Sequence, residues 1–172
     1  MKLYLLRHGD AGERDASNYT SDAARALTSK GIKRTRQLAN SLRQMEITFD
    51  VILSSPLIRA HQTADIIARS LGLEKQLRIA PALAPEHSLT EVIALIESIP
   101  AKTGALLLIG HEPGLSHLIS LLCTGGTNLG LTLKKGGLCR LELSEVKSGQ
   151  CATLEWLLSP RHFGPKRKTR TP

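Results

Sequence analysis

The stretch KLYLLRHGDA, residues 2–11, joins a short apolar run to an arginine, a histidine and a glycine. The apolar part, residues 3–6, has the length and composition of a buried strand. In open α/β sheets, ligands bind in the crevice beyond the carboxyl ends of the strands. We therefore predict that Arg7, His8 and Gly9 lie at the centre of the protein's chemistry.

Apolar runs and amphipathic segments alternate along the rest of the chain. Strands are predicted at residues 50–54, 76–79 and 105–109. Helical patterns bounded by capping or breaking residues occur at 28–45, 57–71, 88–99 and 113–122, and the first of them places Leu38, Leu42 and Met45 at helical spacing. This alternation is typical of a parallel sheet covered by helices on both faces.

Residues 139–143 and 152–158 show a different periodicity. In each segment every second residue is apolar, and the two segments lie on either side of a turn at Ser148 and Gly149. Such period-two runs around a glycine turn predict an antiparallel hairpin. The predicted fold class is therefore α/β, a three-layer α/β/α architecture with a mostly parallel sheet and an antiparallel edge.

Length and composition favour one domain with an aliphatic core. The chain has 172 residues, of which 3% are aromatic; we assign residues 1–159 to a single domain and 160–172 to a basic, flexible tail. No apolar run approaches the roughly 18 residues of a membrane span, and the N-terminus lacks a signal-peptide pattern, so we expect a cytoplasmic protein. The three cysteines, Cys123, Cys139 and Cys151, lack CxxC spacing and are interpreted as small core residues.

Much of the formal net charge of +8 lies in the predicted tail. The tail contains no acidic residue and five cations: Arg161, Lys166, Arg167, Lys168 and Arg170. A basic tail can bind nucleic acid or an anionic surface. Phe163 is the one aromatic residue among these charges, so a solvated terminus is favoured and nucleic acid is not an expected partner.

Polar residues with matched chemistry follow three of the predicted strands. Arg7 and His8 follow the first strand, Arg59 follows residues 50–54, and His111 follows residues 105–109. Because the carboxyl ends of parallel strands lie along one edge, these residues can converge. Arginine pairs bidentately with phosphate oxygens, and two arginines would lower the pKa of nearby histidines. The neutral imidazole is a competent nucleophile, so the set fits phosphoryl transfer.

Two other interpretations of these histidines stay open. His8 could be a hydrogen-bonded structural residue at a strand end. A metal could be held by His8, Asp10 and His111, although the arginines would repel a cation and no HExxH spacing is present. The remaining histidines lack such a context and are interpreted as surface or supporting residues: His61, His87, His117 and His162.

On these residues the sequence resembles the histidine phosphatase superfamily, with its phosphoglycerate-mutase-like fold. The matching landmarks are residues 6–9, the segment 54–64, the run 109–111, and Leu27-Thr28 followed by Gly31. The short chain, the run Arg7-His8-Gly9-Asp10-Ala11 and the lack of a large inserted cap resemble the small SixA-type phosphohistidine phosphatases in particular.

The resemblance implies a role for each residue of the set. His8 would be the nucleophile that becomes phosphorylated, and Arg7, Arg59 and His111 would complete the phosphate pocket. Water would then hydrolyse the phosphohistidine intermediate, with no metal and no cofactor. The implied substrate is a phosphorylated protein, such as a histidine phosphorelay domain.

Glu86 is the candidate for a general acid. Many members of the superfamily carry such an acid, whereas the SixA-type group characteristically lacks it. Imidazole, with a pKa of about 6.5, leaves readily, but an alkoxide needs a proton. If Glu86 points away, the site suits phosphoramidates, which we favour; if it enters the pocket, phosphomonoesters become substrates.

Three functions therefore remain in view. The leading one is a phosphohistidine phosphatase acting on a protein. The second is a small-molecule phosphomonoester phosphatase that uses Glu86 as its acid, and the third is a non-catalytic phosphate-binding module. Asp10 could donate a proton to the leaving group, but we favour a structural role for it in shaping the following loop.

Overall fold

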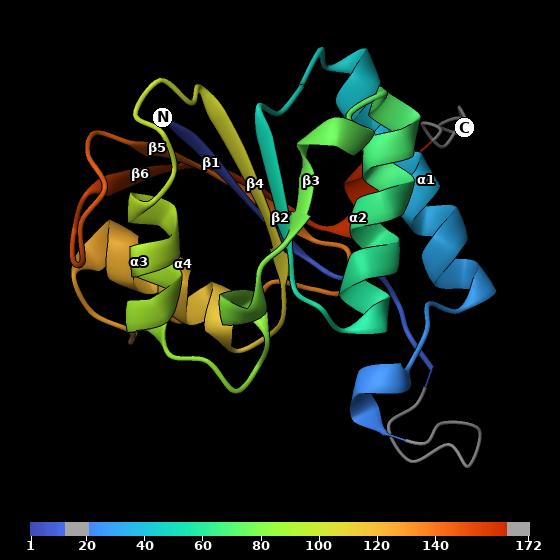
Figure 1. Ribbon diagram of the computed structural model, residues 1–172, viewed down its shortest axis with the longest axis horizontal. Helices are drawn as coiled ribbons and strands as arrows, with labels where there is room; N and C mark the ends of the chain where they lie inside the picture. Colours follow the sequence, from blue (N-terminus) through green and yellow to red (C-terminus); the bar gives the residue numbers. More distant parts are fainter. Residues whose placement is uncertain (13–20, 165–172) are drawn as a thin grey trace, which may run out of the picture.

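A six-stranded sheet forms the middle layer of the molecule (Figure 1). The computed structural model describes residues 1–12 and 21–164. Across the sheet the strand order is β3-β2-β4-β1-β5-β6. The strands are β1 (Lys2–Arg7), β2 (Val51–Ser54), β3 (Leu77–Ile79), β4 (Ala105–Gly110), β5 (Leu138–Leu143) and β6 (Ala152–Leu158).

The pairing within the sheet confirms the predicted fold class. β4 pairs in parallel with β1 and with β2, and β2 pairs in parallel with β3. β5 runs antiparallel to β1, and β6 runs antiparallel to β5, so these two strands form the antiparallel edge. β1 thus lies inside the sheet between β4 and β5, as expected of a continuous apolar strand.

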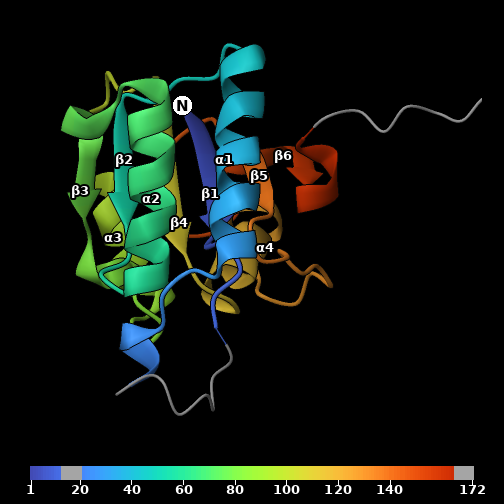
Figure 2. The same cartoon turned by 90° about the vertical axis from the view of Figure 1, so that its right-hand side faces the viewer.

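Four α-helices cover the two faces of the sheet. α1 (Ser29–Gln44) and α2 (Ile58–Leu71) lie on one face, which Figure 2 shows in front; α3 (Leu89–Glu97) and α4 (Gly114–Thr124) lie on the other. Short 3₁₀ turns complete the structure: η1 (Asp22–Ala24), η2 (Glu74–Gln76), η3 (Pro81–Leu83) and η4 (Pro160–His162).

Local sequence explains where the helices begin and end. The Thr28 hydroxyl accepts a hydrogen bond from the Gly31 N–H at 3.0 Å and caps α1. Ser88 and Glu91 form the predicted capping box of α3. Gly72 ends α2 with φ of 72°, a left-handed conformation that glycine adopts without strain.

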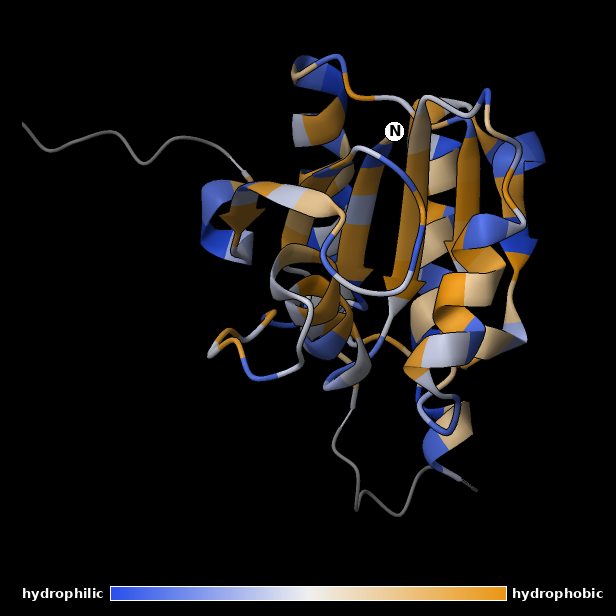
Figure 3. Cartoon of the chain, turned by 90° about the vertical axis from the view of Figure 1, so that its left-hand side faces the viewer, coloured by the Kyte–Doolittle hydropathy of each residue, from blue (hydrophilic) through white to orange (hydrophobic). Residues whose placement is uncertain are grey.

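The core consists of two aliphatic layers, one on each side of the sheet. Leu3 and Leu5 of β1 face α3 and α4, whereas Tyr4 and Leu6 face α1 and α2. Figure 3 shows the hydrophobic strands against helices of mixed hydropathy. Because helices bury both faces of the sheet, polar residues can gather where the strands end.

Three details differ from the sequence-based expectations. Met45 is 48% exposed, because α1 ends at Gln44 and places Met45 beyond the last turn. Leu154 is 40% exposed, because a register irregularity near Arg140 interrupts the alternation of β6. Cys123 is only partly buried, although Cys139 and Cys151 are core residues as predicted.

The first residues of the expected tail lie against the domain. Pro160–His162 form η4, and Phe163 is 6% exposed and packs with the α1–α2 layer of the core. Residues 165–172, with most of the predicted basic charges, lie outside the described residues. In the part of the chain that is described, no helix is long and apolar enough to cross a membrane.

Gly31 is expected to be essential for the junction between β1 and α1. A Cβ atom at this position would clash with the Asp10 carbonyl oxygen, which also accepts the Thr28 N–H at 3.0 Å. We expect Gly31→Ala to destabilise the fold by about 2 kcal/mol or more, because overpacking typically costs about 1–3 kcal/mol and here the clash is with backbone. Thermal unfolding should show this as a Tm lower by about 5 °C or more.

Gly114→Ala is the matched control, since its would-be Cβ meets no atom within 4 Å beyond its chain neighbours and the backbone of its own helix. Its stability should stay within about 1 kcal/mol of wild type. Equal Tm values for the two variants would contradict the proposed close contact between α1 and the loop after β1.

Candidate functional site

The carboxyl ends of β1, β2 and β4 meet at one edge of the sheet, the lower edge in Figure 1. Arg7 lies opposite Gly110 in the register, and the His8 N–H donates to the Gly110 carbonyl oxygen at 3.1 Å. On the other side of β4, the Ser55 N–H donates to the Ile109 carbonyl oxygen at 2.9 Å. The sheet therefore brings the three predicted strand ends together.

His8 is buried at the end of β1, with 5% of its surface exposed. Its Nδ1 lies 2.7 Å from the Gly9 carbonyl oxygen, which can only accept a proton, so Nδ1 carries the hydrogen. Nε2 then accepts the Nε–H of Arg59 at 3.2 Å. This arrangement assigns the lone pair of the imidazole to Nε2.

Burial and neighbouring cations keep His8 neutral. Loss of solvation lowers its pKa most, the Gly9 hydrogen bond opposes this, and the charges of Arg59, Arg7 and Lys135 lower the pKa further, to about 4. The imidazole is therefore neutral at neutral pH, with its one N–H on Nδ1. A neutral histidine with a lone pair on Nε2 is chemically a nucleophile.

His111 lies beside His8, with ring centroids 5.0 Å apart and ring planes at 51°. Its Nε2 is 2.8 Å from the Ser55 hydroxyl oxygen, while its buried Nδ1 has no hydrogen-bond partner among the described residues. Burial lowers the pKa of His111 most, and His8 and Arg59 lower it further. With all contributions its pKa is about 3. The Nδ1 nitrogen is a buried polar atom whose partner the described residues do not supply.

Arg59, in the first turn of α2, joins both sides of the site. Besides contacting His8, it donates from Nη1 to the Asp22 carbonyl oxygen at 2.7 Å and from Nη2 to the Asp22 carboxylate at 2.9 Å. The Thr63 hydroxyl donates to the Arg59 carbonyl oxygen at 2.7 Å and accepts the Gly9 N–H at 3.0 Å. The first turn of α2 is thereby tied to the loop after β1.

Arg7 is held by the loop that precedes β5. Its Nη1 donates to the Leu133 carbonyl oxygen at 3.0 Å, and its Nε has no partner among the described residues. Burial lowers its pKa, and the nearby Glu112 opposes that shift. Glu112 itself accepts the Leu133 N–H at 2.9 Å and the hydroxyl of Ser116 in α4 at 2.5 Å, so its carboxylate joins the loop to α4.

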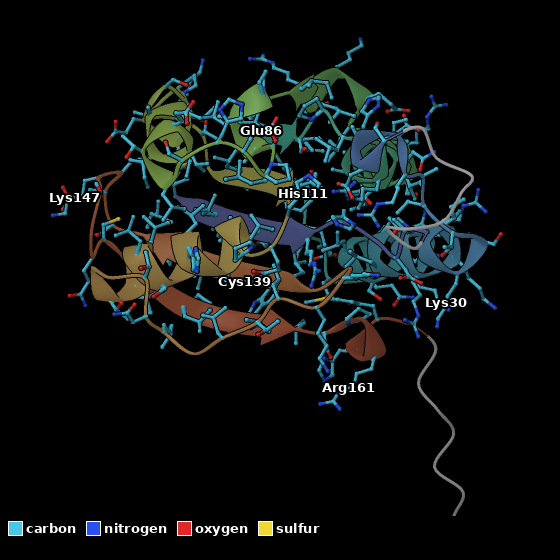
Figure 4. All side chains as sticks on the ribbon, turned by 90° about the horizontal axis from the view of Figure 1, so that it is seen from below. Lys30, Glu86, His111, Cys139, Lys147 and Arg161 are labelled. Atoms are coloured by element: carbon cyan, nitrogen blue, oxygen red, sulfur yellow. The ribbon has the colours of Figure 1, made fainter. Side chains whose placement is uncertain are left out.

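An open cavity of about 1040 Å³ covers this edge of the sheet. It is lined by every residue predicted for the site: Arg7, His8, Arg59, His111 and Glu86. Glu86 is exposed and forms no hydrogen bond or ion pair with the described residues; Figure 4, which looks onto this edge, labels it beside His111. The other histidines, His61, His87, His117 and His162, do not line the cavity.

Asp22 and Arg25 also line the cavity, and sequence reasoning did not single them out. The Asp22 carboxylate pairs with Arg25 at 2.7 Å and with Arg59 at 2.9 Å. Neither residue follows a predicted strand or belongs to a recognised motif, and residues 13–20, which precede them, lie outside the described residues.

Asp10 has the contacts of a residue that shapes a loop. Its carbonyl oxygen accepts the Thr28 N–H, and its carboxylate pairs with Lys135 at 3.1 Å.

Within the described ranges, no group of three or more histidine, cysteine or acidic residues could hold a metal ion. The cavity lining brings two arginines, Arg7 and Arg59, together with neutral imidazoles, a combination that suits a phosphoryl group.

Comparisons with known proteins agree with this chemistry. The family model of the histidine phosphatase superfamily (branch 1) matches residues 3–85. The phosphohistidine phosphatase SixA of Escherichia coli (strain K12) is 30% identical over 161 residues, which cover 93% of this chain and 94% of that protein. An uncharacterized protein of Picosynechococcus sp. is 41% identical over 169 residues, covering 96% of this chain and all of that protein.

Solved structures extend the likeness to three dimensions. A structure of the protein histidine phosphatase SixA complexed with tungstate has a TM-score of 0.80 and 29% identity, and the alignment covers 94% of this chain and 99% of that one. Shared sequence, fold and site chemistry lead to one assignment. The chain is a phosphatase that belongs to the histidine phosphatase superfamily and is similar to its SixA members.

Proposed function

We propose that the protein hydrolyses phosphohistidine on another protein, with His8 as the phosphoryl acceptor. The observation that carries this proposal is the state of His8: buried, neutral, protonated on Nδ1, and with Nε2 beside the Arg59 guanidinium. Such a nitrogen can attack phosphorus without first losing a proton. The SixA likeness supports the same substrate class.

The reaction proceeds in two balanced steps. His8 Nε2 forms a bond to phosphorus while the N–P bond of the substrate breaks. The substrate ring carries a proton on the nitrogen that is not bonded to phosphorus, so the returning electron pair leaves it as neutral imidazole. Water then attacks the phosphorus of phospho-His8, the N–P bond breaks, its electron pair returns to Nε2, and inorganic phosphate is released. Arg7, Arg59 and His111 stabilise the transferring group by facing its oxygens with donors.

The surroundings of Glu86 favour a phosphoramidate substrate. Imidazole has a pKa of about 6.5, so a phosphohistidine ring can itself carry the proton with which it leaves as neutral imidazole, whereas an alkoxide must receive a proton from an acid of the enzyme. Glu86 is exposed, and in the described structure no partner holds its carboxyl group toward the reacting atoms. A phosphomonoesterase that uses Glu86 is the second candidate, since this residue does line the cavity.

A substrate panel with Glu86→Gln tests the two candidates. We expect wild-type enzyme to hydrolyse a phosphohistidine peptide with kcat/KM at least about 100-fold above that for sugar phosphates, because general acid catalysis accounts for about that factor. Glu86→Gln should leave the phosphohistidine rate nearly unchanged. Preference for sugar phosphates, with a large loss in Glu86→Gln, would instead favour the phosphomonoesterase; phosphate binding without any turnover would favour a non-catalytic module.

A further inference from the structure

A second, basic cavity of about 450 Å³ adjoins the reaction pocket and shares Arg7, Asp10 and Lys135 with it. Beyond those shared residues it runs between the start of α1, the loop before β5, and η4. We name it the basic groove and define it by its five cations other than Arg7: Lys30, Arg34, Lys134, Lys135 and Arg161.

The charge of the basic groove is largely uncompensated. Lys30, Arg34, Lys134 and Arg161 are exposed, and none forms an ion pair with an acid among the described residues. Asp10 is the one acidic residue in the lining, and Lys135 neutralises it at 3.1 Å. Neighbouring cations without counter-charges raise the local concentration of anionic groups.

Two of these cations occupy positions that are unfavourable for the helix itself. Lys30 lies in the first turn of α1, which contains no acid, although the positive end of a helix disfavours cations. Arg34 follows four residues later, a spacing at which like charges repel each other. An acidic ligand in the groove would relieve both repulsions, and helix stability alone gives no reason for this arrangement.

The basic groove is rigidly connected to the phosphate site. Its loop is fixed by Leu133, which accepts a hydrogen bond from Arg7 and donates one to Glu112. The next turn is fixed by the Gly136 N–H, which donates to the His8 carbonyl oxygen at 2.9 Å. A chain lying in the groove would therefore keep a constant position relative to the His8 imidazole.

The groove lies on one side of the reaction centre. Figure 4 shows Lys30 and Arg161 on the side of His111 that faces away from Glu86. Its cations are spread along an open surface and come from three separate segments. This spacing suits several carboxylates along a polypeptide better than one compact anion.

We propose that the basic groove binds an acidic segment of the phosphorylated protein substrate, adjacent to its phosphohistidine. The inference rests on the proposed function and adds to it the charge of the partner's surface. Since the contacts are at an exposed rim, they act mainly on substrate capture and its salt dependence, and less on the chemical step.

Two phosphohistidine peptides test this inference, one with a run of glutamates beside the phosphohistidine and one with glutamines there. We expect wild-type enzyme to have a KM about tenfold lower for the glutamate peptide, as electrostatic capture typically provides, with similar kcat for both. The double variant Lys30→Glu/Arg34→Glu should lose this preference while hydrolysing the glutamine peptide as before. High salt should remove the preference in wild type.

Lys75→Glu/Arg78→Glu is the matched control, because it changes the charge equally near the opposite edge of the sheet. It should retain the preference for glutamates. Equal KM values for the two peptides in wild type, a preserved preference in the groove variant, or its loss in the control would each overturn the inference. If wild type hydrolyses neither peptide, the proposed function itself fails, which is a distinguishable result.

Discussion

Replacing His8 with alanine is expected to abolish both turnover and labelling of the protein by phosphate from a phosphohistidine peptide. The variant loses the imidazole nitrogen that accepts the Nε–H of Arg59. Removing a nucleophile typically lowers kcat by about 10⁵-fold or more. Turnover is measured by phosphate release, and the intermediate by acid-labile radiolabel on the protein.

Chemical rescue separates a missing nucleophile from a damaged fold. Free imidazole can occupy the space of the deleted ring, so it should restore part of the turnover of His8→Ala without labelling the protein. His117→Ala serves as the control, since His117 is exposed on α4 and does not line the cavity. Persistent labelling of His8→Ala would show that another residue accepts the phosphoryl group and would refute the proposed role.

The convergence of the site could be predicted because it depends on a simple geometric rule. Arg7 and His8 lie at the end of β1, His111 directly follows β4, and Arg59 lies in the helix that follows β2. Parallel strands present their carboxyl ends at a common edge. Local patterns identify those strands well: the buried runs of β1 and β4 are nearly uninterrupted aliphatic sequence. The mutual position of His8, Arg59 and His111 then follows from the sheet, although their detailed contacts do not.

Contacts between irregular segments could not be predicted in the same way. Asp22 reaches Arg59 only because η1 folds back over α2, and no sequence periodicity encodes that path. The exposure of Leu154 likewise depends on a strand irregularity that has no signal in the alternation itself. The charge of the arginines predicted that they would lower the pKa of the histidines. Burial is the larger cause of that lowering, and it became known only from the packed structure.

Asp22 presents oxygen acceptors to the Arg59 guanidinium, as a bound phosphoryl group would. Its carbonyl and carboxylate oxygens accept two Arg59 N–H groups, and Arg25 holds the same carboxylate. Arg59 is 3% exposed, so this pairing orients a guanidinium that is otherwise costly to bury. The arginine is thereby positioned before substrate arrives, which reduces the reorganisation needed during the reaction.

Replacing Arg59 with alanine is therefore expected to have the second largest effect on catalysis. The variant loses a charge opposite the transferring group and the Nε–H that contacts His8 Nε2, and kcat/KM should fall by about 10³-fold or more. Arg59→Lys keeps the charge without the planar fork and should recover only a small part of the activity. Arg69→Ala, which removes an exposed arginine from the last turn of α2, should behave like wild type.

The pH profile distinguishes this electrostatic role from a purely structural one. The charge of Arg59 lowers the pKa of His8, which is about 4 in the intact site. Without Arg59 that pKa rises, so protonated His8 persists to higher pH and the acid limb of kcat/KM should move upward from its position near pH 4. An unchanged acid limb in folded Arg59→Ala, verified by its thermal unfolding, would mean that Arg59 does not set the protonation of the nucleophile.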